Sequence, residues 1–327
     1  MRRVLITGAS GLLGRPIWTA CSSVGDWQVT GTAFRRAGQG VAKVDLSAVD
    51  TIPAFLDLYR PDAIIHSAAE RRPDVSEKDP EGTKRLNVDA TAAIATWAKR
   101  KGAYLIYISS DYVFDGTQAP YMPDSPTCPI NTYGLSKLAG EHAIRDSGAM
   151  AALLRVPILY GAVQYLAESS VTVLVQNMLN ARGTGQLLPM EHWATRYPTL
   201  TDDVAVVLRQ MLDYHFMKGP LTGIYHWSGS EPMTKYEMSL VFAKEIGFDP
   251  ARLVPDATPP GSGASRPKDC HLDSSLLESL GMGQRTPFAV AIPRILEGVK
   301  MAPLRCTRGR AEHDTFYPEK VAKNRSS

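Results

Sequence analysis

The sequence predicts an α/β fold with a doubly wound parallel sheet and a smaller C-terminal α/β lobe. Strand and helix patterns alternate up to about residue 160, which is typical of parallel α/β sheets. A short strand at residues 2–7 runs directly into a glycine-rich turn, and beyond residue 162 the alternation loosens. We therefore expect a Rossmann-like domain over residues 1–161, to which later segments can return. A smaller substrate or partner lobe over 162–300 and a basic tail over 301–327 would come after it.

Composition excludes several classes of protein. The 327 residues are 44% hydrophobic and 21% charged, as in ordinary globular proteins. The four cysteines are widely spaced, so we expect free thiols in a reducing compartment and no metal site. No apolar run approaches the roughly 18 residues that span a bilayer. The sequence thus predicts a cytoplasmic protein that binds neither membrane nor nucleic acid.

Net charge is +3, and its excess lies at the C-terminal end. Residues 301–327 carry six Lys or Arg against three Asp or Glu, while the rest of the chain carries 30 of each. Such a tail could bind an acidic partner or remain a solvated terminus.

The glycine-rich turn spans residues 8–14 and opens an apolar helix. In this context three glycines allow a tight turn, a close approach of backbone to a pyrophosphate, and close packing of helix on sheet. The turn predicts a dinucleotide site formed by Gly8, Ser10, Gly11, Leu12, Leu13 and Gly14.

The second strand, at residues 28–34, ends where such a site meets the adenosine ribose. An acid there would favour NAD, but no Asp or Glu lies between Asp26 and Asp45, and Arg35 and Arg36 follow Phe34 instead. Guanidinium groups suit a 2′-phosphate, so we expect NADP(H). A third strand ending at residues 44–46 would place Asp45 and Leu46 beside the adenine, and residues 47–50 resemble a capping box for the next helix.

The fourth strand, at residues 62–66, ends in small residues that let backbone pass close to a cofactor, including Ser67 and Ala68. His66 has no second metal ligand in view and is expected in the core. A helix over residues 80–100 and a strand over 104–108 should come next.

The candidate catalytic residues are Ser110, Tyr133 and Lys137. Ser110 follows the fifth strand, and Asn131 is placed to cap the helix that carries Tyr133 and Lys137 one turn apart. A lysine that close could lower the pKa of the phenol. In a hydride-transfer site Tyr133 would donate a proton to the substrate oxygen, Ser110 would hydrogen-bond that oxygen, and Lys137 would hold the nicotinamide ribose.

The second half predicts helices at residues 171–179, 202–214 and 234–246, the last with Thr234 and Glu237 as a capping box. Residues 224–227 predict a strand, and 256–267 a flexible Pro/Gly-rich loop that could close over a ligand. His192-Trp193 and His226-Trp227 either bind a partner or pack the lobe.

The first 160 residues resemble the extended short-chain dehydrogenase/reductase family, in particular its dTDP-4-dehydrorhamnose reductase branch. Residues 108–116 (ISSDYVFDG) and Tyr133 with Lys137 carry this resemblance. A narrower one covers nearly the whole chain: residues 68–75, 86–90, 226–229, 233–238 and 283–288 are similar to the regulatory beta subunits of methionine adenosyltransferase.

That resemblance implies an NADP-binding protein that associates with the catalytic alpha subunit, which makes S-adenosylmethionine from methionine and ATP. It implies NADP(H) contacts from Ser10, Gly11, Leu12, Leu13, Phe34, Arg35, Arg36, Asp45, Leu46, Ser67, Arg71, Tyr133 and Leu159. In that family the C-terminal segment helps to engage the alpha subunit. Here the sequence departs from the pattern beyond about Val290, so the mode of partner contact stays open.

One site is compatible with two functions. The first is a regulatory subunit that need not turn over a substrate, and the alternative is an NADPH-dependent reductase of a 4-keto nucleotide sugar. Intact Ser110, Tyr133 and Lys137 do not separate them, because Tyr133 and Lys137 also bind cofactor. A dehydratase would want an acid directly after Asp111, where Tyr112 stands.

Overall fold

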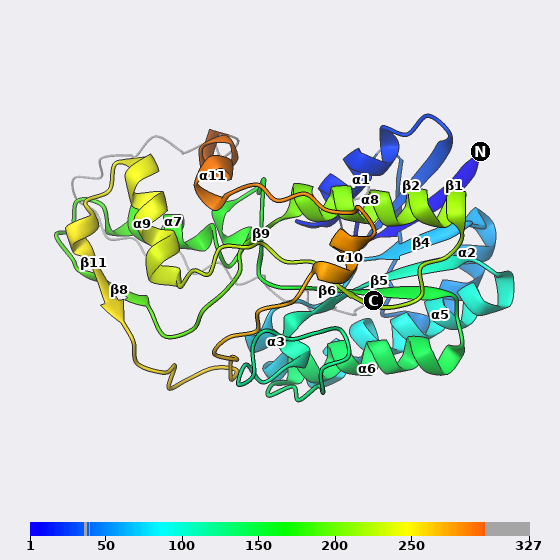
Figure 1. The fold of residues 1–327 in the computed structure, drawn as a ribbon, viewed down its shortest axis with the longest axis horizontal. Helices are drawn as coiled ribbons and strands as arrows, with labels where there is room; N and C mark the ends of the chain where they lie inside the picture. The colour runs from blue at the N-terminus through cyan, green and yellow to red at the C-terminus, as the bar shows by residue number, and fades with distance from the viewer. Residues whose placement is uncertain (36–37, 39, 298–327) are drawn as a thin grey trace, which may run out of the picture.

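A seven-stranded parallel sheet forms the larger part of the molecule in a computed structural model that describes residues 1–35, 38 and 40–297 (Figure 1). The strand order is β10-β6-β5-β4-β1-β2-β3, and every neighbouring pair is parallel. The strands are β1 (Arg2–Thr7), β2 (Trp27–Ala33), β3 (Val41–Lys43), β4 (Ala63–His66), β5 (Tyr104–Ser110), β6 (Ala151–Val156) and β10 (Gly223–His226). The predicted doubly wound α/β fold is therefore confirmed.

Helices cover both faces of this sheet. Helices α1 (Gly14–Ser22) and α8 (Thr201–Lys218) lie on one face; α2 (Ile52–Tyr59), α5 (Ala90–Lys101) and α6 (Thr132–Ser147) lie on the other (Figure 1). Strand β5 is buried along its whole length, as expected for a central parallel strand. Two apolar clusters, one on each face, form the core of this part.

The sheet is completed by segments from the second half of the chain. Strand β10 pairs with β6, and α8 packs against α1. Both come after residue 162, so the chain does return to the sheet. The boundaries at 161/162 and 300/301 stay predictions, and the basic tail lies outside the described residues.

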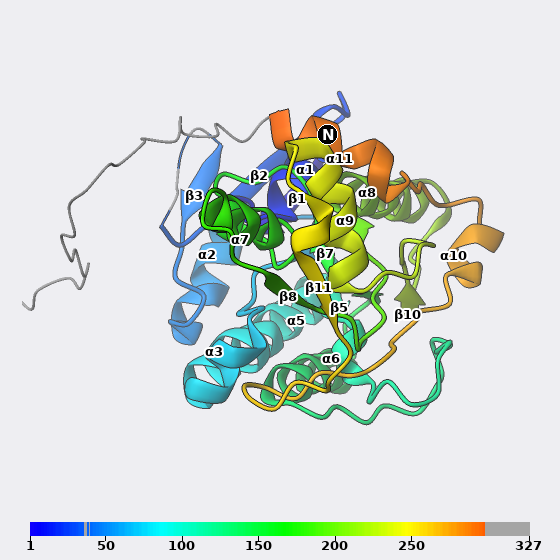
Figure 2. The same ribbon diagram turned by 90° about the vertical axis from the view of Figure 1, so that its left-hand side faces the viewer.

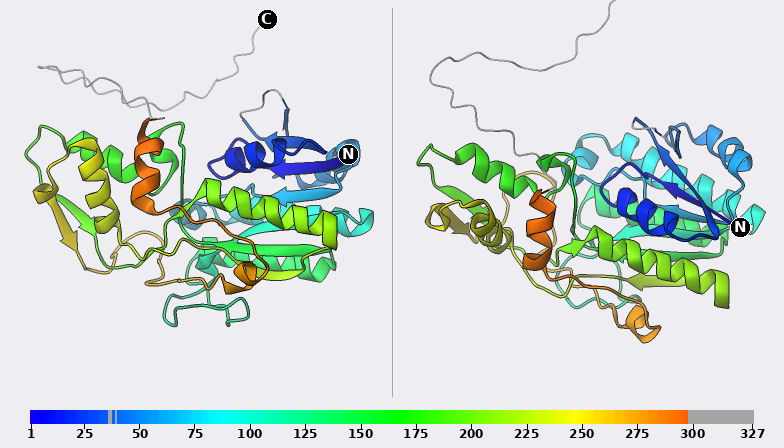
Figure 3. Two further views of the ribbon diagram at one scale, coloured as in Figure 1. Left: turned by 45° about the horizontal axis from the view of Figure 1, so that its top comes forward. Right: turned by 90° about the horizontal axis from the view of Figure 1, so that it is seen from above.

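A second apolar core lies beside the sheet. It is built mainly by α7 (Val173–Ala181), α9 (Lys235–Ile246) and α11 (Phe288–Glu297). Strands β8 (Leu188–Glu191) and β11 (Leu253–Asp256) pair in parallel next to them. Figure 3 shows this group at one end of the sheet, and Figure 2 looks onto that end, with the group in front of the sheet. A short parallel pair, β7 (Leu159–Tyr160) with β9 (Thr199–Leu200), lies between the two parts. The remaining helices are α3 (Pro73–Lys78), α4 (Pro80–Lys84) and α10 (Ser275–Ser279).

Short 3-10 turns join several of these elements. They are η1 (Val49–Thr51), η3 (Asp111–Val113), η4 (Leu166–Glu168) and η5 (Pro250–Arg252). Within the described residues no helix is long and apolar enough to cross a membrane.

One local prediction is wrong. The capping box at residues 47–50 does not form: Asp45 accepts hydrogen bonds from the backbone N–H and hydroxyl of Ser47, and α2 begins only at Ile52, after η1. The helix predicted over 80–100 is confirmed, since α4, the π-helical turn η2 (Arg85–Asp89) and α5 follow one another without a break. The turn contains Asn87, whose side chain bonds the backbone N–H and C=O of Glu70 and the hydroxyl of Ser136.

Capping predictions at two other helices are confirmed. The Asn131 side chain accepts a hydrogen bond from the backbone N–H of Gly134 at the start of α6. Thr234 and Glu237 form the expected capping box of α9. The helices predicted at 171–179 and 202–214 are α7 and α8, with shifted ends.

Candidate functional site

A cavity of about 780 Å³ opens at the carboxyl ends of the central strands. Open parallel sheets bind ligands at this edge. Nearly all the predicted site residues line the cavity: Gly8, Ser10, Gly11, Leu12, Leu13, Gly14, Phe34, Asp45, Leu46, Ser67, Ala68, Arg71, Ser110, Tyr133, Lys137 and Leu159. Arg35 is not part of its wall, and Arg36 lies outside the described residues. The fold therefore gathers widely separated segments of the sequence around one space.

The glycine turn needs glycine for geometric reasons. Gly8 has a positive φ of 70°, and a Cβ there would lie 3.0 Å from the backbone of Ala68. A Cβ on Gly14 would lie 2.1 Å from the carbonyl oxygen of Gly8. The first turn of α1 thus lies directly on the loop after β1, leaving backbone exposed to the cavity, as a pyrophosphate site requires.

Phe34, which follows β2, also lines the cavity, and its side chain is 53% exposed. The Arg35 guanidinium carbon lies 5.7 Å from the centre of its ring. Asp45 and Leu46 line the same end of the cavity, although β3 already ends at Lys43. An exposed aromatic ring with a stacked guanidinium group suits an adenine and its attached phosphate.

The ends of β1 and β4 are tied by the Thr7 side chain. Its hydroxyl accepts hydrogen bonds from the backbone N–H groups of Ser67 and Ala68, and the Ser67 hydroxyl donates to the Thr7 carbonyl oxygen. His66 is buried between the hydroxyls of Thr7 and Thr91, and burial lowers its pKa to about 3. The prediction that His66 is a core residue is confirmed.

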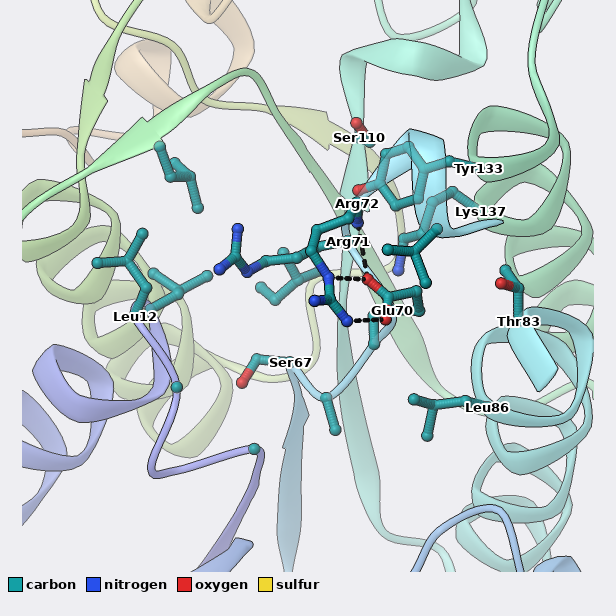
Figure 4. Close-up of a pocket in the computed structure, with 18 of the residues that line it drawn as sticks. Leu12, Ser67, Glu70, Arg71, Arg72, Thr83, Leu86, Ser110, Tyr133 and Lys137 are labelled. Carbon is teal, nitrogen blue, oxygen red and sulfur yellow. Dashed lines mark hydrogen bonds and ion pairs between the residues drawn. The ribbon is translucent and has the colours of Figure 1, made fainter. Parts of the chain in front are cut away.

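Arg71 reaches across the cavity from the loop after β4 (Figure 4). Its guanidinium group donates to the backbone carbonyl of Glu168 in η4. The Glu168 carboxylate in turn forms a bidentate ion pair with Arg15 of α1, with N–O distances of 2.8 and 2.9 Å. These contacts join the glycine turn, the β4 loop and the second part of the chain. No local pattern in the sequence marks the Arg15–Glu168 pair.

Ser110, Tyr133 and Lys137 lie together on the side of the cavity formed by β5 and α6 (Figure 4). Burial raises the pKa of the Tyr133 phenol to about 12, and a hydrogen bond with Ser110 opposes the shift. Burial lowers the pKa of Lys137 to about 7, while the Glu141 carboxylate opposes that shift. The expected lowering of the Tyr133 pKa by Lys137 is thus wrong, because burial of the phenol outweighs any such effect, and the Lys137 ammonium lies 4.1 Å from the centre of the Tyr107 ring.

The Ser110 hydroxyl forms hydrogen bonds with the next two residues in the chain. Its hydroxyl donates to the Asp111 carboxylate at 2.9 Å and accepts from the backbone N–H of Tyr112. Burial raises the pKa of Asp111 to about 7, so this carboxyl group is partly protonated near neutrality. Asp111 also lines the cavity.

Ser109 also lines the cavity, but its hydroxyl group belongs to a buried hydrogen-bond network. Its hydroxyl donates to Glu141 at 2.5 Å, and Glu141 forms a buried ion pair with Arg155 of β6. This network, which pattern reasoning missed, holds α6 against β5 and β6 directly behind Tyr133 and Lys137.

The structure separates the two His-Trp pairs, which were predicted either to bind a partner or to pack the lobe. His226 and Trp227 are each 1% exposed, so they pack the interior and offer no surface to a partner. His192 bonds the Thr234 hydroxyl, and both His192 and Trp193 are half-buried. A partner role for His192-Trp193 stays a prediction. In the part of the chain that the structure describes, no group of His, Cys, Asp and Glu side chains could hold a metal ion.

Three cationic residues of the second half also line the cavity: Arg196, Lys235 and Arg266. Sequence reasoning missed all three. Lys235 lies in the capping box, which was predicted only as local structure, and Arg266 lies in the 256–267 loop, which was predicted to be able to close over a ligand without any of its residues being named. The lysine directly after a helix N-cap was the available signal, because a cation is disfavoured at that end of a helix.

Comparison with known proteins gives the same two levels of similarity. Residues 1–301 match the RmlD substrate binding domain family. A methionine adenosyltransferase 2 subunit beta from Pongo abelii is 44% identical over 295 residues, which cover 90% of this chain and 87% of that protein.

Among solved structures, a dTDP-4-dehydrorhamnose reductase from Clostridium acetobutylicum superposes with a TM-score of 0.78 at 24% identity, covering 90% of this chain and 98% of that one. A dTDP-4-dehydrorhamnose reductase from Bacillus anthracis in complex with NADP gives 0.76 at 23% identity, covering 91% and 99%. At these identities the two structures establish the shared fold.

Proposed function

Because this chain belongs to the family of methionine adenosyltransferase 2 beta subunits, within the wider RmlD substrate binding domain family, we propose that it is an NADP-binding regulatory subunit. It modulates S-adenosylmethionine synthesis by a catalytic alpha subunit. The observation that carries the proposal is the 44% identity over 87% of a protein named methionine adenosyltransferase 2 subunit beta. A match of that extent includes both parts of the molecule.

The cavity supports dinucleotide binding by this chain. The glycine turn leaves no room for a Cβ at Gly14, and the backbone of residues 8–14 lies open to a pyrophosphate. Phe34, Asp45 and Leu46 would hold the adenosine, and Ser67, Ala68, Arg71 and Leu159 would line the path to the nicotinamide. Tyr133 and Lys137 would hold the nicotinamide ribose.

NADP(H) is proposed over NAD(H) for an electrostatic reason. No acid lies between Asp26 and Asp45, and Arg35 and Arg36 follow Phe34 in the sequence. The double variant Arg35→Ala with Arg36→Ala should weaken NADPH binding at least tenfold and NADH binding much less, measured by fluorescence titration. Arg145→Ala, an exposed arginine of α6 that does not line the cavity, is the matched control. Equal weakening of both cofactors would refute the assignment.

Regulation is tested with the partner enzyme. A methionine adenosyltransferase alpha subunit would be assayed for S-adenosylmethionine synthesis with and without the full-length chain, and the complex would be measured by size-exclusion chromatography with light scattering. A stable complex with altered kcat or KM is expected. If the two proteins elute separately and the kinetics are unchanged, the proposal fails.

A reductase is the second candidate, because Ser110, Tyr133 and Lys137 all line the same cavity. A bound NADPH would supply hydride to a carbonyl carbon. Tyr133 would then donate its proton to the carbonyl oxygen, and Ser110 would hydrogen-bond that oxygen. NADPH oxidation with a dTDP-4-keto-6-deoxy sugar, abolished in Tyr133→Phe, would favour this function.

A further inference from the structure

Residues 257–267 connect the second apolar core to the sheet domain. The segment begins directly after β11 and runs to the side of the molecule where α3 lies, as Figures 1 and 2 show. Its first part, residues 257–263, is exposed throughout and contains two prolines and two glycines. Among the described residues this part makes one hydrogen bond, from the Thr258 N–H to the Asp256 carboxylate. The segment is therefore held mainly at its two ends.

The far end is fastened to the sheet domain by two side chains. Asp74 of α3 accepts a hydrogen bond from the backbone N–H of Ala264 at 2.9 Å and forms an ion pair with Arg266 at 2.6 Å. Asn131, the N-cap of α6, donates from its side-chain amide to the carbonyl oxygen of Ser265 at 2.7 Å. Three consecutive residues of the segment are thus attached to α3 and α6, and we call these contacts the latch.

The chain that follows the latch is fixed by backbone contacts. The Lys268 carbonyl oxygen accepts a hydrogen bond from the Thr195 N–H at 2.8 Å, and the Asp269 N–H donates to the Gly116 carbonyl at 3.3 Å. Gly116 has a φ of 81°, and a Cβ there would lie 2.6 Å from the Lys268 nitrogen, so the two backbones pack closely. Movement on opening of the latch is therefore confined to residues before Lys268.

The latch lies at the end of the cavity that contains Tyr133. Asp74 and Arg266 both line the cavity. Burial raises the pKa of the Tyr112 phenol, and the nearby Arg266 charge partly opposes this shift. The Tyr112 ring in turn meets the Tyr133 ring edge-on, with 5.8 Å between the ring centres. The latch is thus one side chain away from the residue that would hold the nicotinamide ribose.

This end of the cavity is covered. Ser110 and Lys137 are only 5% and 3% exposed, so a nicotinamide ring can reach them only if covering residues move. The Asp74 and Arg266 side chains of the latch are 51% and 21% exposed, and ion pairs this accessible to solvent contribute little to stability. The latch can therefore open without unfolding either apolar core.

We propose that residues 257–267 form a lid, and that the latch must open for the dinucleotide to enter and leave the cavity. This rests on the proposed function, because it assigns control of exchange at the proposed cofactor site. The Asn131 side chain caps α6 through its oxygen and holds the lid through its nitrogen. The lid is thereby attached to the helix that carries Tyr133 and Lys137.

Two variants of the full chain open the latch in different ways. Arg266→Met removes the ion pair with Asp74. Asn131→Ser keeps an oxygen that caps α6 and changes no charge, but it loses the amide nitrogen that bonds the Ser265 carbonyl. A feature that both variants share is therefore caused by the open latch and not by a lost charge or a lost helix cap.

Hydrogen–deuterium exchange measures opening of the lid, and stopped-flow fluorescence measures NADPH association and dissociation. In both variants the amides of residues 257–266 should exchange faster, and both NADPH rates should rise about fivefold, because a gate affects entry and exit alike. Lys84→Met is the matched control. Its ion pair with Asp89 is similarly exposed, and neither residue lines the cavity, so it should behave as the wild-type protein does.

Three results would overturn the proposal. Faster amide exchange with unchanged NADPH rates would show that the lid does not control entry. Unchanged amide exchange would show that the latch does not hold the lid. A lower association rate in Arg266→Met, with wild-type rates in Asn131→Ser, would make Arg266 a ligand contact and not part of a gate. Wild-type protein that does not bind NADPH would refute the proposed function as well, and this is recognised before any variant is compared.

Discussion

The buried pair of Glu141 and Arg155 should be the most sensitive ionic contact in the sheet domain. Both side chains are 2% exposed, and Arg155 donates from two nitrogens to the two carboxylate oxygens at 2.9 and 2.7 Å. Arg155→Met keeps much of the side-chain volume but leaves the Glu141 carboxylate buried with only the Ser109 hydroxyl as a donor. Removing one partner of a buried pair typically costs about 3–5 kcal/mol.

We therefore expect Arg155→Met to lower the free energy of unfolding by about 3–5 kcal/mol at pH 7. The double variant Glu141→Met with Arg155→Met removes both charges, so it should recover most of this loss. Urea denaturation followed by circular dichroism measures both. Arg209→Met is the matched control, because its pair with Asp213 on α8 is about one-third exposed and should contribute about 0–1 kcal/mol.

Two outcomes would refute this reasoning. If Arg155→Met lost no more stability than Arg209→Met, the pair would be better solvated than its burial indicates. If the double variant were as unstable as the single one, the loss would come from packing of the Arg155 side chain, which lies 5.1 Å from the centre of the Phe114 ring, and not from the unpaired charge.

Three further predictions concern the candidate site. Gly14→Ala should abolish dinucleotide binding in a fluorescence titration, because the new Cβ would lie 2.1 Å from the Gly8 carbonyl oxygen; Gly25→Ala, where nothing lies within 4 Å, should bind normally. NADPH affinity should be constant at low pH and fall as pH rises above about 7, because the Lys137 ammonium has a pKa of about 7 in the free protein and its charged form binds the ribose; an affinity independent of pH between about 6 and 9 would exclude this. Asn131→Ala should lower the free energy of unfolding by about 1 kcal/mol in urea denaturation, because the helix that carries Lys137 loses its N-cap; no loss would show that other groups cap it.

Local patterns predicted the part of the site that lies on the sheet. The glycine turn, the end of β2 and the helix N-cap at Asn131 each combine a residue preference with a position in a repeating strand and helix pattern. Because the strands are parallel, their carboxyl ends necessarily lie at the same edge of the sheet, and no knowledge of the tertiary contacts is needed to predict this. For this reason Gly8, Phe34, Ser67 and Ser110 could be assigned to one cavity before the fold was known.

Contacts between distant segments could not be predicted in this way. Arg15 and Glu168 are 153 residues apart, and Arg266 and Asp74 are 192 apart. Neither pair has a local spacing that marks it, because the pairing depends on how the second apolar core is positioned beside the sheet. Arg196 was missed for the same reason, because nothing in its local sequence points to the cavity.

The protonation state of Tyr133 explains why an intact set of Ser110, Tyr133 and Lys137 does not by itself make the protein an enzyme. With a pKa of about 12 the phenol keeps its proton at neutral pH, which suits donation to a substrate oxygen but also suits a hydrogen bond to a ribose hydroxyl. Each pKa unit corresponds to about 1.4 kcal/mol, so ionising Tyr133 in this environment is about 3 kcal/mol harder than in water. The two functions thus diverge only after the cofactor has bound: a substrate carbonyl beside Tyr133 makes the site catalytic, whereas without one the same residues only bind the dinucleotide.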